Sequence, residues 1–290
     1  MSFTAYGLSV GIRTNDAEVL ERVLSLLPPK WTPNESTVVE SLFSLRVGKP
    51  SNRPGRRNYH LLYFGAARLA RSLNMDEVCD ILENYLQLTI AYWAREDHLF
   101  VHAGVVGWRE RAIVIPGRSF SGKTTLVSAL IQAGATYYSD EMAVFDPHGR
   151  VQPYPVPLSV REAGGKCRMT PDAFGGCEGR EPLPVGLVVV TEYHEGARWQ
   201  PRPLTPARAL MALLDNTVAA RRDPKVSLPI LQRVVETSSA FKSKRGEAAG
   251  VVASLLALLQ AVTPTQRPHD RNTEEQKRAH DSKRIDHKLS

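Results

Sequence analysis

The chain has few cysteines and no long apolar run. Its three cysteines, Cys79, Cys167 and Cys177, are odd in number and irregularly spaced, which argues against a disulfide framework and, without His partners nearby, against a zinc site. No stretch of about 20 apolar residues occurs that could span a membrane. The N-terminus also lacks the basic and apolar regions of a secretory signal. We therefore expect a cytoplasmic protein with no membrane partner.

Aromatic residues are missing from the two short basic clusters, at 53–57 and 221–222. The formal net charge is +7, and part of this excess lies in the polar stretch at 267–288. Without aromatic rings on which bases could stack, the basic clusters do not favour a nucleic-acid partner. We interpret them as solvated surface and expect no nucleic acid to bind.

Residues 117–125 read GRSFSGKTT, which is a complete G-x-x-x-x-G-K-[ST] phosphate-binding motif. Its two glycines, Gly117 and Gly122, allow backbone angles that let successive N–H groups converge on phosphate oxygens. A lysine in this position supplies positive charge to the β- and γ-phosphates, and the following threonine hydroxyl can hold Mg²⁺. The predicted nucleotide-binding loop comprises Gly117, Arg118, Ser119, Phe120, Ser121, Gly122, Lys123, Thr124 and Thr125.

The sequence around this loop fits the motif. The apolar run 112–115 predicts a buried strand, and residues 125–131 have helical apolar spacing that ends near Gly134. A second strand is predicted at 99–106, and only the short turn 107–111 separates it from the strand that enters the loop. Doubly wound nucleotide folds normally separate parallel strands by helices. The hairpin therefore predicts an α/β protein with a mixed sheet.

The rest of the chain is expected to form three parts. Residues 1–97 predict a small N-terminal α+β domain, residues 98–263 the domain that holds the loop, and residues 264–290 a disordered charged tail. Within the second part we expect a strand at 136–145 with two adjacent acids, Asp140 and Glu141, and a central strand at 185–191. A mobile loop is predicted at 163–180, and helices at about 205–216, 228–241 and 246–262.

Three features together resemble the catalytic domain of HPr kinase/phosphorylase. They are His102 followed shortly by Gly104, the hairpin that leads into the phosphate loop, and the acidic pair on the next strand. The segment 158–161, which ends at Arg161, is similar to the segment that follows the acids in related kinases. The resemblance covers about residues 99–262 and implies a P-loop kinase fold that is also similar to ATP-dependent phosphoenolpyruvate carboxykinase.

The chain also departs from that family. It has Asp140-Glu141 where two Asp residues are usual, Ala103 stands between His102 and Gly104, and there is no clear counterpart of the C-terminal HPr-binding signature. The sequence looks at least as close to divergent relatives that phosphorylate a Ser hydroxyl of ribosomally made peptides, such as lasso-peptide tailoring kinases. The expected acceptor is thus a Ser hydroxyl of a protein or peptide.

The resemblance implies roles for individual residues in ATP- and Mg²⁺-dependent transfer of the γ-phosphate. Asp140 is the expected catalytic base, and Thr124, Glu141 and Asp140 are the candidate metal ligands. Because adjacent side chains of a strand point to opposite faces, we rank Glu141 below Asp140. His102 is expected to orient Asp140 or contact phosphate, while Arg161 would reach the γ-phosphate or the acceptor with its forked guanidinium. Lys123 completes the predicted catalytic set.

Two other functions remain open at this point. One is a regulatory module that binds a nucleotide and hydrolyses it slowly or not at all, and the other is a small-molecule kinase. A binding module needs the phosphate loop but no base, so the two acids distinguish it from a kinase. The sequence leaves open whether the chain forms a homo-oligomer.

Overall fold

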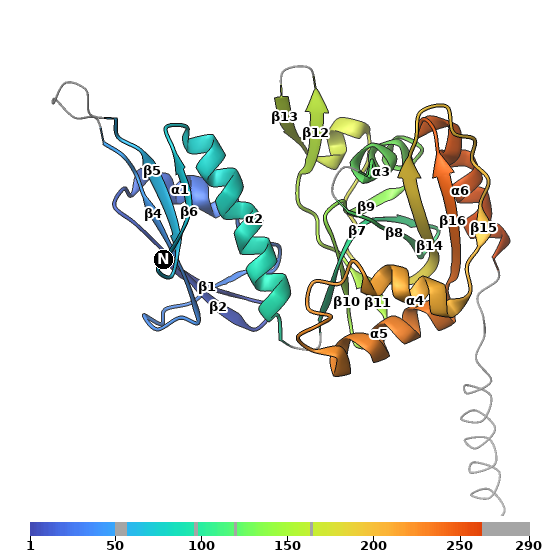
Figure 1. Cartoon of the computed structure of the whole chain (residues 1–290), viewed down its shortest axis with the longest axis horizontal. Coiled ribbons are helices and arrows are strands. Elements are labelled where there is room, and N and C mark those ends of the chain that lie inside the picture. The colour runs from blue at the N-terminus through green and yellow to red at the C-terminus, as the bar shows by residue number, and fades with distance from the viewer. Residues whose placement is uncertain (50–56, 96–97, 119–120, 163–164, 263–290) are drawn as a thin grey trace, which may run out of the picture.

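The computed structural model describes residues 1–49, 57–95, 98–118, 121–162 and 165–262, without the side chains of residues 161, 162, 165 and 166. The tail predicted at 264–290 lies outside these residues, as do Ser119 and Phe120 of the loop. Two large sheets, of six and eight strands, organise the described chain (Figure 1). No helix within the described ranges is long and apolar enough to cross a membrane.

The six-stranded sheet is built from the first part of the chain. Its order is β3-β1-β2-β4-β5-β6, with β2 and β4 parallel and the other pairs antiparallel. The strands are β1 (Ser2–Ala5), β2 (Leu8–Thr14), β3 (Thr32–Pro33), β4 (Ser41–Arg46), β5 (His60–Phe64) and β6 (Ala67–Ser72). Two helices, α1 (Glu18–Leu24) and α2 (Met75–Trp93), belong to the same region, whose domain limits stay a prediction.

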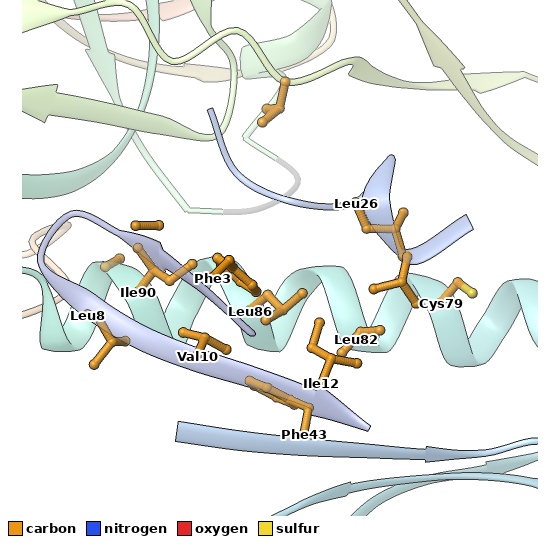
Figure 2. Packing of buried hydrophobic residues seen from close by; sticks show 14 of the residues in the cluster. Phe3, Leu8, Val10, Ile12, Leu26, Phe43, Cys79, Leu82, Leu86 and Ile90 are labelled. Atoms are coloured by element: carbon orange, nitrogen blue, oxygen red, sulfur yellow. The ribbon is translucent and has the colours of Figure 1, made fainter. Parts of the chain in front are cut away.

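Helix α2 holds this sheet through one apolar face. Asn74 caps the helix, since its side chain accepts a hydrogen bond from the backbone N–H of Asp76. Leu82, Leu86 and Ile90 then lie at helical spacing and are fully buried against the sheet (Figure 2). Burial of such a side chain contributes about 1.5–3 kcal/mol, so packing fixes α2 on the sheet.

The eight-stranded sheet is mixed, as the hairpin predicted. Its order is β11-β10-β7-β8-β14-β16-β15, and β9 also pairs with β7. Strand β14 pairs in parallel with β8 on one side and with β16 on the other. Strand β8 in turn pairs antiparallel with β7. The bounds are β7 (Leu99–Trp108), β8 (Arg111–Pro116), β9 (Thr136–Ser139), β10 (Met142–Phe145), β11 (Arg150–Gln152), β14 (Leu183–Tyr193), β15 (Arg202–Pro203) and β16 (Ser239–Arg245).

Helices cover both faces of this second sheet. One apolar cluster joins α3 (Lys123–Gln132) and α6 (Ala249–Ala261) to β8 and β14, and another joins α4 (Pro206–Leu214) and α5 (Pro224–Thr237) to the opposite face. A third cluster reaches from the six-stranded sheet to the eight-stranded one. In it, the ring centroids of Tyr6 and Phe100 are 5.0 Å apart in an edge-on arrangement, and Tyr154 packs on both rings.

Two elements outside the candidate active site differ from the sequence prediction. The helix predicted at 228–241 ends at Thr237, and residues 239–245 form strand β16 instead. The sequence of β16 hides its strand character, because the buried positions include Ser243 and Arg245. The loop predicted at 163–180 contains β13 (Gly165–Met169), paired with β12 (Leu158–Glu162), and a short 3-10 helix at Pro171–Phe174. Part of the predicted loop is therefore regular structure.

Candidate active site

The described part of the phosphate loop lies between the end of β8 and the start of α3. Gly122 has φ +83°, a left-handed conformation that disfavours any residue with a Cβ. A Cβ there would also lie 2.5 Å from Nη2 of Arg245, so the end of that arginine side chain would have to move to make room for it. Helix α3 begins at Lys123, and its N-terminal N–H groups provide a site that favours anions.

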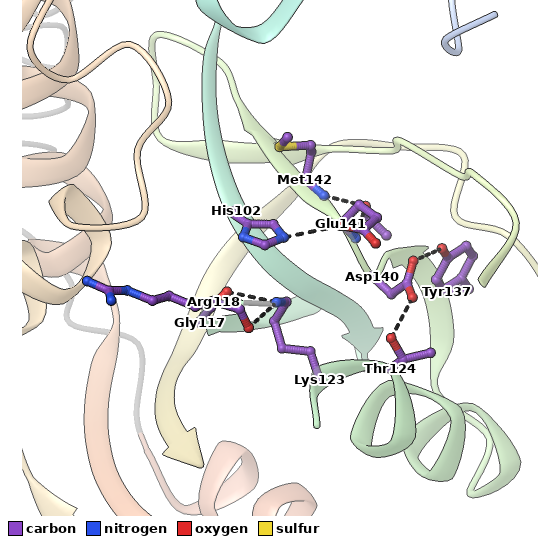
Figure 3. A network of polar contacts seen from close by, with 10 residues as sticks. His102, Gly117, Arg118, Lys123, Thr124, Tyr137, Asp140, Glu141 and Met142 are labelled. Atoms are coloured by element: carbon purple, nitrogen blue, oxygen red, sulfur yellow. Dashed lines mark hydrogen bonds and ion pairs between the residues drawn. The ribbon is translucent and has the colours of Figure 1, made fainter. Parts of the chain in front are cut away.

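Lys123 is held inside this loop. It is 8% exposed, and its Nζ donates hydrogen bonds to the carbonyl oxygens of Gly117 at 2.7 Å and Arg118 at 3.0 Å. Burial lowers the pKa of Lys123, while the charges of Glu141 and Asp140 oppose that shift. Figure 3 shows the ammonium group in contact with both loop carbonyls, while the side chain of Arg118 points away from it. The loop thus buries one positive charge.

The two acids do not lie within one strand, and the prediction of a continuous strand at 136–145 is wrong. Asp140 and Glu141 form a bend between β9 and β10, both of which pair with β7. The Ser139 hydroxyl fixes the bend, since it accepts hydrogen bonds from the backbone N–H groups of Glu141 at 3.2 Å and Met142 at 3.0 Å. The bend removes the strict strand alternation. The charges of both carboxylates therefore oppose the lowering of the pKa of Lys123.

Asp140 is the deeply buried member of the pair, at 1% exposed. Its Oδ2 accepts a hydrogen bond from the Thr124 hydroxyl at 3.0 Å, and its Oδ1 lies 3.2 Å from the Tyr137 hydroxyl. Burial, followed by the charge of Glu141, raises the pKa of Asp140 to about 6, against the opposing effects of these two hydroxyls and Lys123. The structure therefore places Asp140 beside the threonine of the motif.

Glu141 is paired with the predicted histidine. Its Oε2 lies 3.1 Å from Nε2 of His102, and the two side chains are 38% and 24% exposed, respectively. The backbone N–H of His102 donates to the carbonyl of Asn216 at 2.7 Å, which ties this part of β7 to the end of α4. His102 thus contacts Glu141, whereas we expected it to orient Asp140 or to contact phosphate, and the second of these roles stays a prediction.

The structure gives fewer contacts for the other predicted site residues. Arg161 lies in β12 opposite Lys166, and its role stays a prediction because its side chain is outside the described atoms. Thr125 is exposed on the first turn of α3. The Ser121 hydroxyl is buried and has no hydrogen-bond partner among the described residues, so it is a polar atom inside the loop that a ligand could contact.

Sequence reasoning missed a second buried cation. Arg245, at the end of β16, is 1% exposed, and its Nη2 and Nη1 donate to the carbonyls of Gly122 at 2.6 Å and Gly246 at 3.0 Å. Its Nε is buried without a partner in the part of the chain that the structure describes, and burial lowers the pKa of the guanidinium. The only sequence signal was an arginine next to a glycine, which does not distinguish it from a surface residue.

Tyr137 was also missed. Its hydroxyl lies 2.6 Å from the carbonyl of Val156 and 3.2 Å from Asp140, and a phenol has one proton to donate to these two acceptors. Burial raises the pKa of Tyr137 well above its ordinary value, so the hydroxyl stays neutral. In the sequence it read only as an apolar neighbour of the acids.

Comparisons with known proteins give little information about this site. No protein-family model matches the chain, and no curated protein matches it. Among solved structures, the Hpr(Ser) kinase/phosphatase from Coxiella burnetii is 16% identical with a TM-score of 0.29, over 65% of this chain and 98% of that chain. These values indicate no more than a distant likeness, so the chemistry has to be read from the residues of this chain.

Proposed function

We propose that the protein is an ATP- and Mg²⁺-dependent kinase that transfers the γ-phosphate to a Ser hydroxyl of a protein or peptide. One observation carries the proposal: at the start of α3, beside the buried Lys123, the Thr124 hydroxyl is hydrogen-bonded at 3.0 Å to the buried carboxyl group of Asp140. Phosphoryl transfer needs positioned positive charge and metal ligands, and these three groups supply both.

The oxygen atoms of the site suit Mg²⁺. This ion prefers oxygen ligands and is commonly bound by one or two carboxylates together with substrate phosphates. Within the described ranges no group of three or more His, Cys, Asp or Glu side chains could hold a metal alone, which fits an ion shared with a nucleotide. Thr124 and Asp140 would hold it, and Mg²⁺-ATP would then supply the phosphoryl group with its charge partly neutralised.

Lys123 would bind the phosphates. An ammonium group has three protons, and two of them now point to the loop carbonyls of Gly117 and Arg118. Phosphate oxygens are charged acceptors and compete well against neutral carbonyls. We therefore expect the loop to open its carbonyl contacts to Lys123 when a nucleotide binds.

The proposed base is Glu141, which reverses the ranking from the sequence. Asp140 is 1% exposed and its Oδ2 is bonded to Thr124, so an acceptor hydroxyl would have to displace that contact. The Glu141 side chain is 38% exposed, and His102 holds its Oε2 at 3.1 Å. A base has to come within hydrogen-bond reach of the proton it accepts, and exposure favours Glu141.

The nature of the acceptor rests on the resemblance of the sequence to HPr kinase/phosphorylase and its peptide-modifying relatives. The order of His102, the phosphate loop and the acid pair carries that resemblance. A protein or peptide Ser, in the cytoplasm, is therefore the acceptor that we propose to test first. A panel of Ser-containing peptides and slow ATP hydrolysis provide the two readouts.

Nucleotide binding is tested with Lys123→Ala. ATP affinity measured by calorimetry in the presence of Mg²⁺ should fall by at least about 100-fold, because charge-assisted hydrogen bonds to phosphate are lost. Lys225→Ala is the matched control, since Lys225 is an exposed lysine on α5, outside the loop. Unchanged ATP affinity of Lys123→Ala at an unchanged melting temperature would refute the nucleotide site.

The acids are tested separately. Glu141→Gln should bind Mg²⁺-ATP normally and transfer phosphate about 10²- to 10⁴-fold more slowly, the usual contribution of a general base. Asp140→Asn should instead weaken the dependence of ATP binding on Mg²⁺. A transfer defect in Asp140→Asn alone would return the base to Asp140. If neither change matters and no acceptor is phosphorylated, the protein is a nucleotide-binding module.

A further inference from the structure

Three neighbouring parallel strands end at the edge of the sheet that holds the phosphate loop (Figure 1). The loop follows β8, Tyr193 ends β14 and Arg245 ends β16, and these last two residues are directly paired across the parallel strands. In open α/β sheets, ligands bind outside the carboxyl ends of the strands. Tyr193 therefore lies at the edge of the sheet where a ligand of the loop would bind.

The side chain of Tyr193 is on the face of the sheet that carries α3. Alternate residues of a strand share a face, and Val189, four positions earlier, packs with α3 in one apolar cluster. The backbone N–H of Tyr193 donates to the carbonyl of Ser121 at 3.3 Å, and a Cβ on Gly122 would lie 3.4 Å from the Cβ of Tyr193. The tyrosine thus packs directly against the phosphate loop.

The Tyr193 ring is exposed and held in place. At 41% exposed, it is the one exposed Phe, Tyr or Trp side chain among the described residues of the eight-stranded sheet and its helices. Its hydroxyl donates to Oε1 of Glu247 at 2.9 Å, and the guanidinium carbon of Arg245 lies 5.7 Å from the ring centroid. A ring that is already fixed loses little conformational entropy when a flat ligand stacks on it.

Residues next to Tyr193 carry buried polar atoms that have no hydrogen-bond partner among the described residues. These atoms are Oγ of Ser121, Oγ1 of Thr191 and Nε of Arg245. Thr191 and Arg245 are themselves 8% and 1% exposed. Because buried polar atoms are normally satisfied, three such atoms near an exposed ring indicate a ligand that has both hydrogen-bonding groups and a flat apolar surface.

We propose that Tyr193 is the platform on which the base of a bound nucleoside triphosphate stacks. A nucleotide has the two properties that this surface matches: phosphates for the loop, and a planar base with polar edges for the ring and its neighbours. The inference rests on the proposed function, because it assigns a further part of the same nucleotide site. It makes Tyr193 the residue that selects a nucleotide over a simple polyphosphate.

Calorimetry with Mg²⁺-ATP and with Mg²⁺-tripolyphosphate, which has no base, tests the platform. Tyr193→Ala should lower ATP affinity at least about fivefold, because stacking of the base is lost, and should leave tripolyphosphate affinity unchanged. Tyr193→Phe keeps the ring and should bind ATP within about threefold of the wild type. Tyr85→Ala is the matched control, since Tyr85 is a 42% exposed tyrosine on α2, and it should change neither affinity.

The outcomes distinguish the platform from the nucleotide site itself. Equal losses for the two ligands in Tyr193→Ala would make Tyr193 a brace of the loop, and unchanged affinity for both would give it no role in binding. Either result overturns the platform and leaves the proposed function intact. A wild type that binds neither ligand would refute the nucleotide site together with the platform. If Tyr193→Ala does not fold, Tyr193→Leu keeps the bulk against the loop without an aromatic ring, and it should show the loss for ATP alone.

Discussion

The interiors of the two sheets differ in what they bury. Among the described residues, the first 95 bury only uncharged polar side chains, those of Ser41, Gln87 and Thr89. The eight-stranded sheet and its helices bury three charged ones, Lys123, Asp140 and Arg245. All three gather at the start of α3, where Arg245 and Lys123 bind loop carbonyls and Asp140 binds Thr124.

The difference indicates that the core of the six-stranded sheet serves stability, whereas the buried charges of the eight-stranded sheet serve function. A buried charge is expensive unless hydrogen bonds satisfy it, and an apolar side chain of similar size is often at least as stable in its place. Clusters of such groups with shifted pKa values mark candidate sites for chemistry. The comparison predicts that truncation destabilises the first core, whereas neutralising the charges of the second leaves stability equal or higher.

The largest expected effect on stability is in the first core. Phe43 is fully buried, and its ring centroid lies 4.9 Å from that of Phe64. Phe43→Ala should lower the free energy of unfolding by about 3–5 kcal/mol, because it removes buried apolar surface and leaves a cavity. Urea unfolding followed by tryptophan fluorescence measures this. Val38→Ala, at a position 80% exposed, is the control and should change stability by no more than about 0.5 kcal/mol.

The same division explains what could be predicted from the sequence. The phosphate loop, the mixed sheet and α2 are encoded by local signals: a motif of fixed spacing, a hairpin turn, and an Asn cap before an apolar stripe. The mixed sheet was confirmed. The contact of Arg245 with the loop was not predictable in this way, since Arg245 and Gly122 are 123 positions apart in the sequence.

The acid pair was found but its geometry was not. Strand alternation argued that Asp140 and Glu141 point to opposite faces, and the bend that removes this constraint depends on the Ser139 hydroxyl and on the pairing of β9 and β10 with β7. These are tertiary contacts, so periodicity in the sequence does not report them. Tyr137 and its contact with Val156 were missed for the same reason.

The second prediction concerns Asp140 and pH. Its pKa is raised to about 6 by burial, so its favourable effect on folding is complete in acid and is lost as the pH rises through about 6. A shift of about two units corresponds to roughly 3 kcal/mol of stability lost at pH 8. Asp140→Asn keeps the shape and can still accept from Thr124, so without nucleotide or Mg²⁺ it should be more stable than the wild type at pH 8.

The measurement compares urea midpoints of both proteins at pH 4.5 and pH 8, where the gain should be small at the lower pH and larger at the higher one. Asp215→Asn, at an exposed position that ends α4, should show no such trend. A loss of stability at pH 8 would mean that attraction between Asp140 and Lys123 outweighs burial. The buried charge of Asp140 would then stabilise the fold, contrary to the proposed difference between the two cores.

The smallest expected change in stability sharpens the comparison most, because it separates a structural arginine from a functional one. Arg245→Met removes a buried charge and two hydrogen bonds, but the Gly122 carbonyl keeps its contact with the backbone N–H of Leu126 at 3.2 Å. Methionine fills a similar volume, so the free energy of unfolding should stay equal or rise by about 1 kcal/mol.

ATP affinity should fall at least about tenfold, since one of the two buried cations beside the loop is lost. Arg245→Lys keeps the charge without the forked donor and should fall between Met and the wild type in ATP affinity. A loss of several kcal/mol in Arg245→Met, with ATP affinity unchanged, would instead make Arg245 a brace for the loop and leave Lys123 as the cation that binds phosphate.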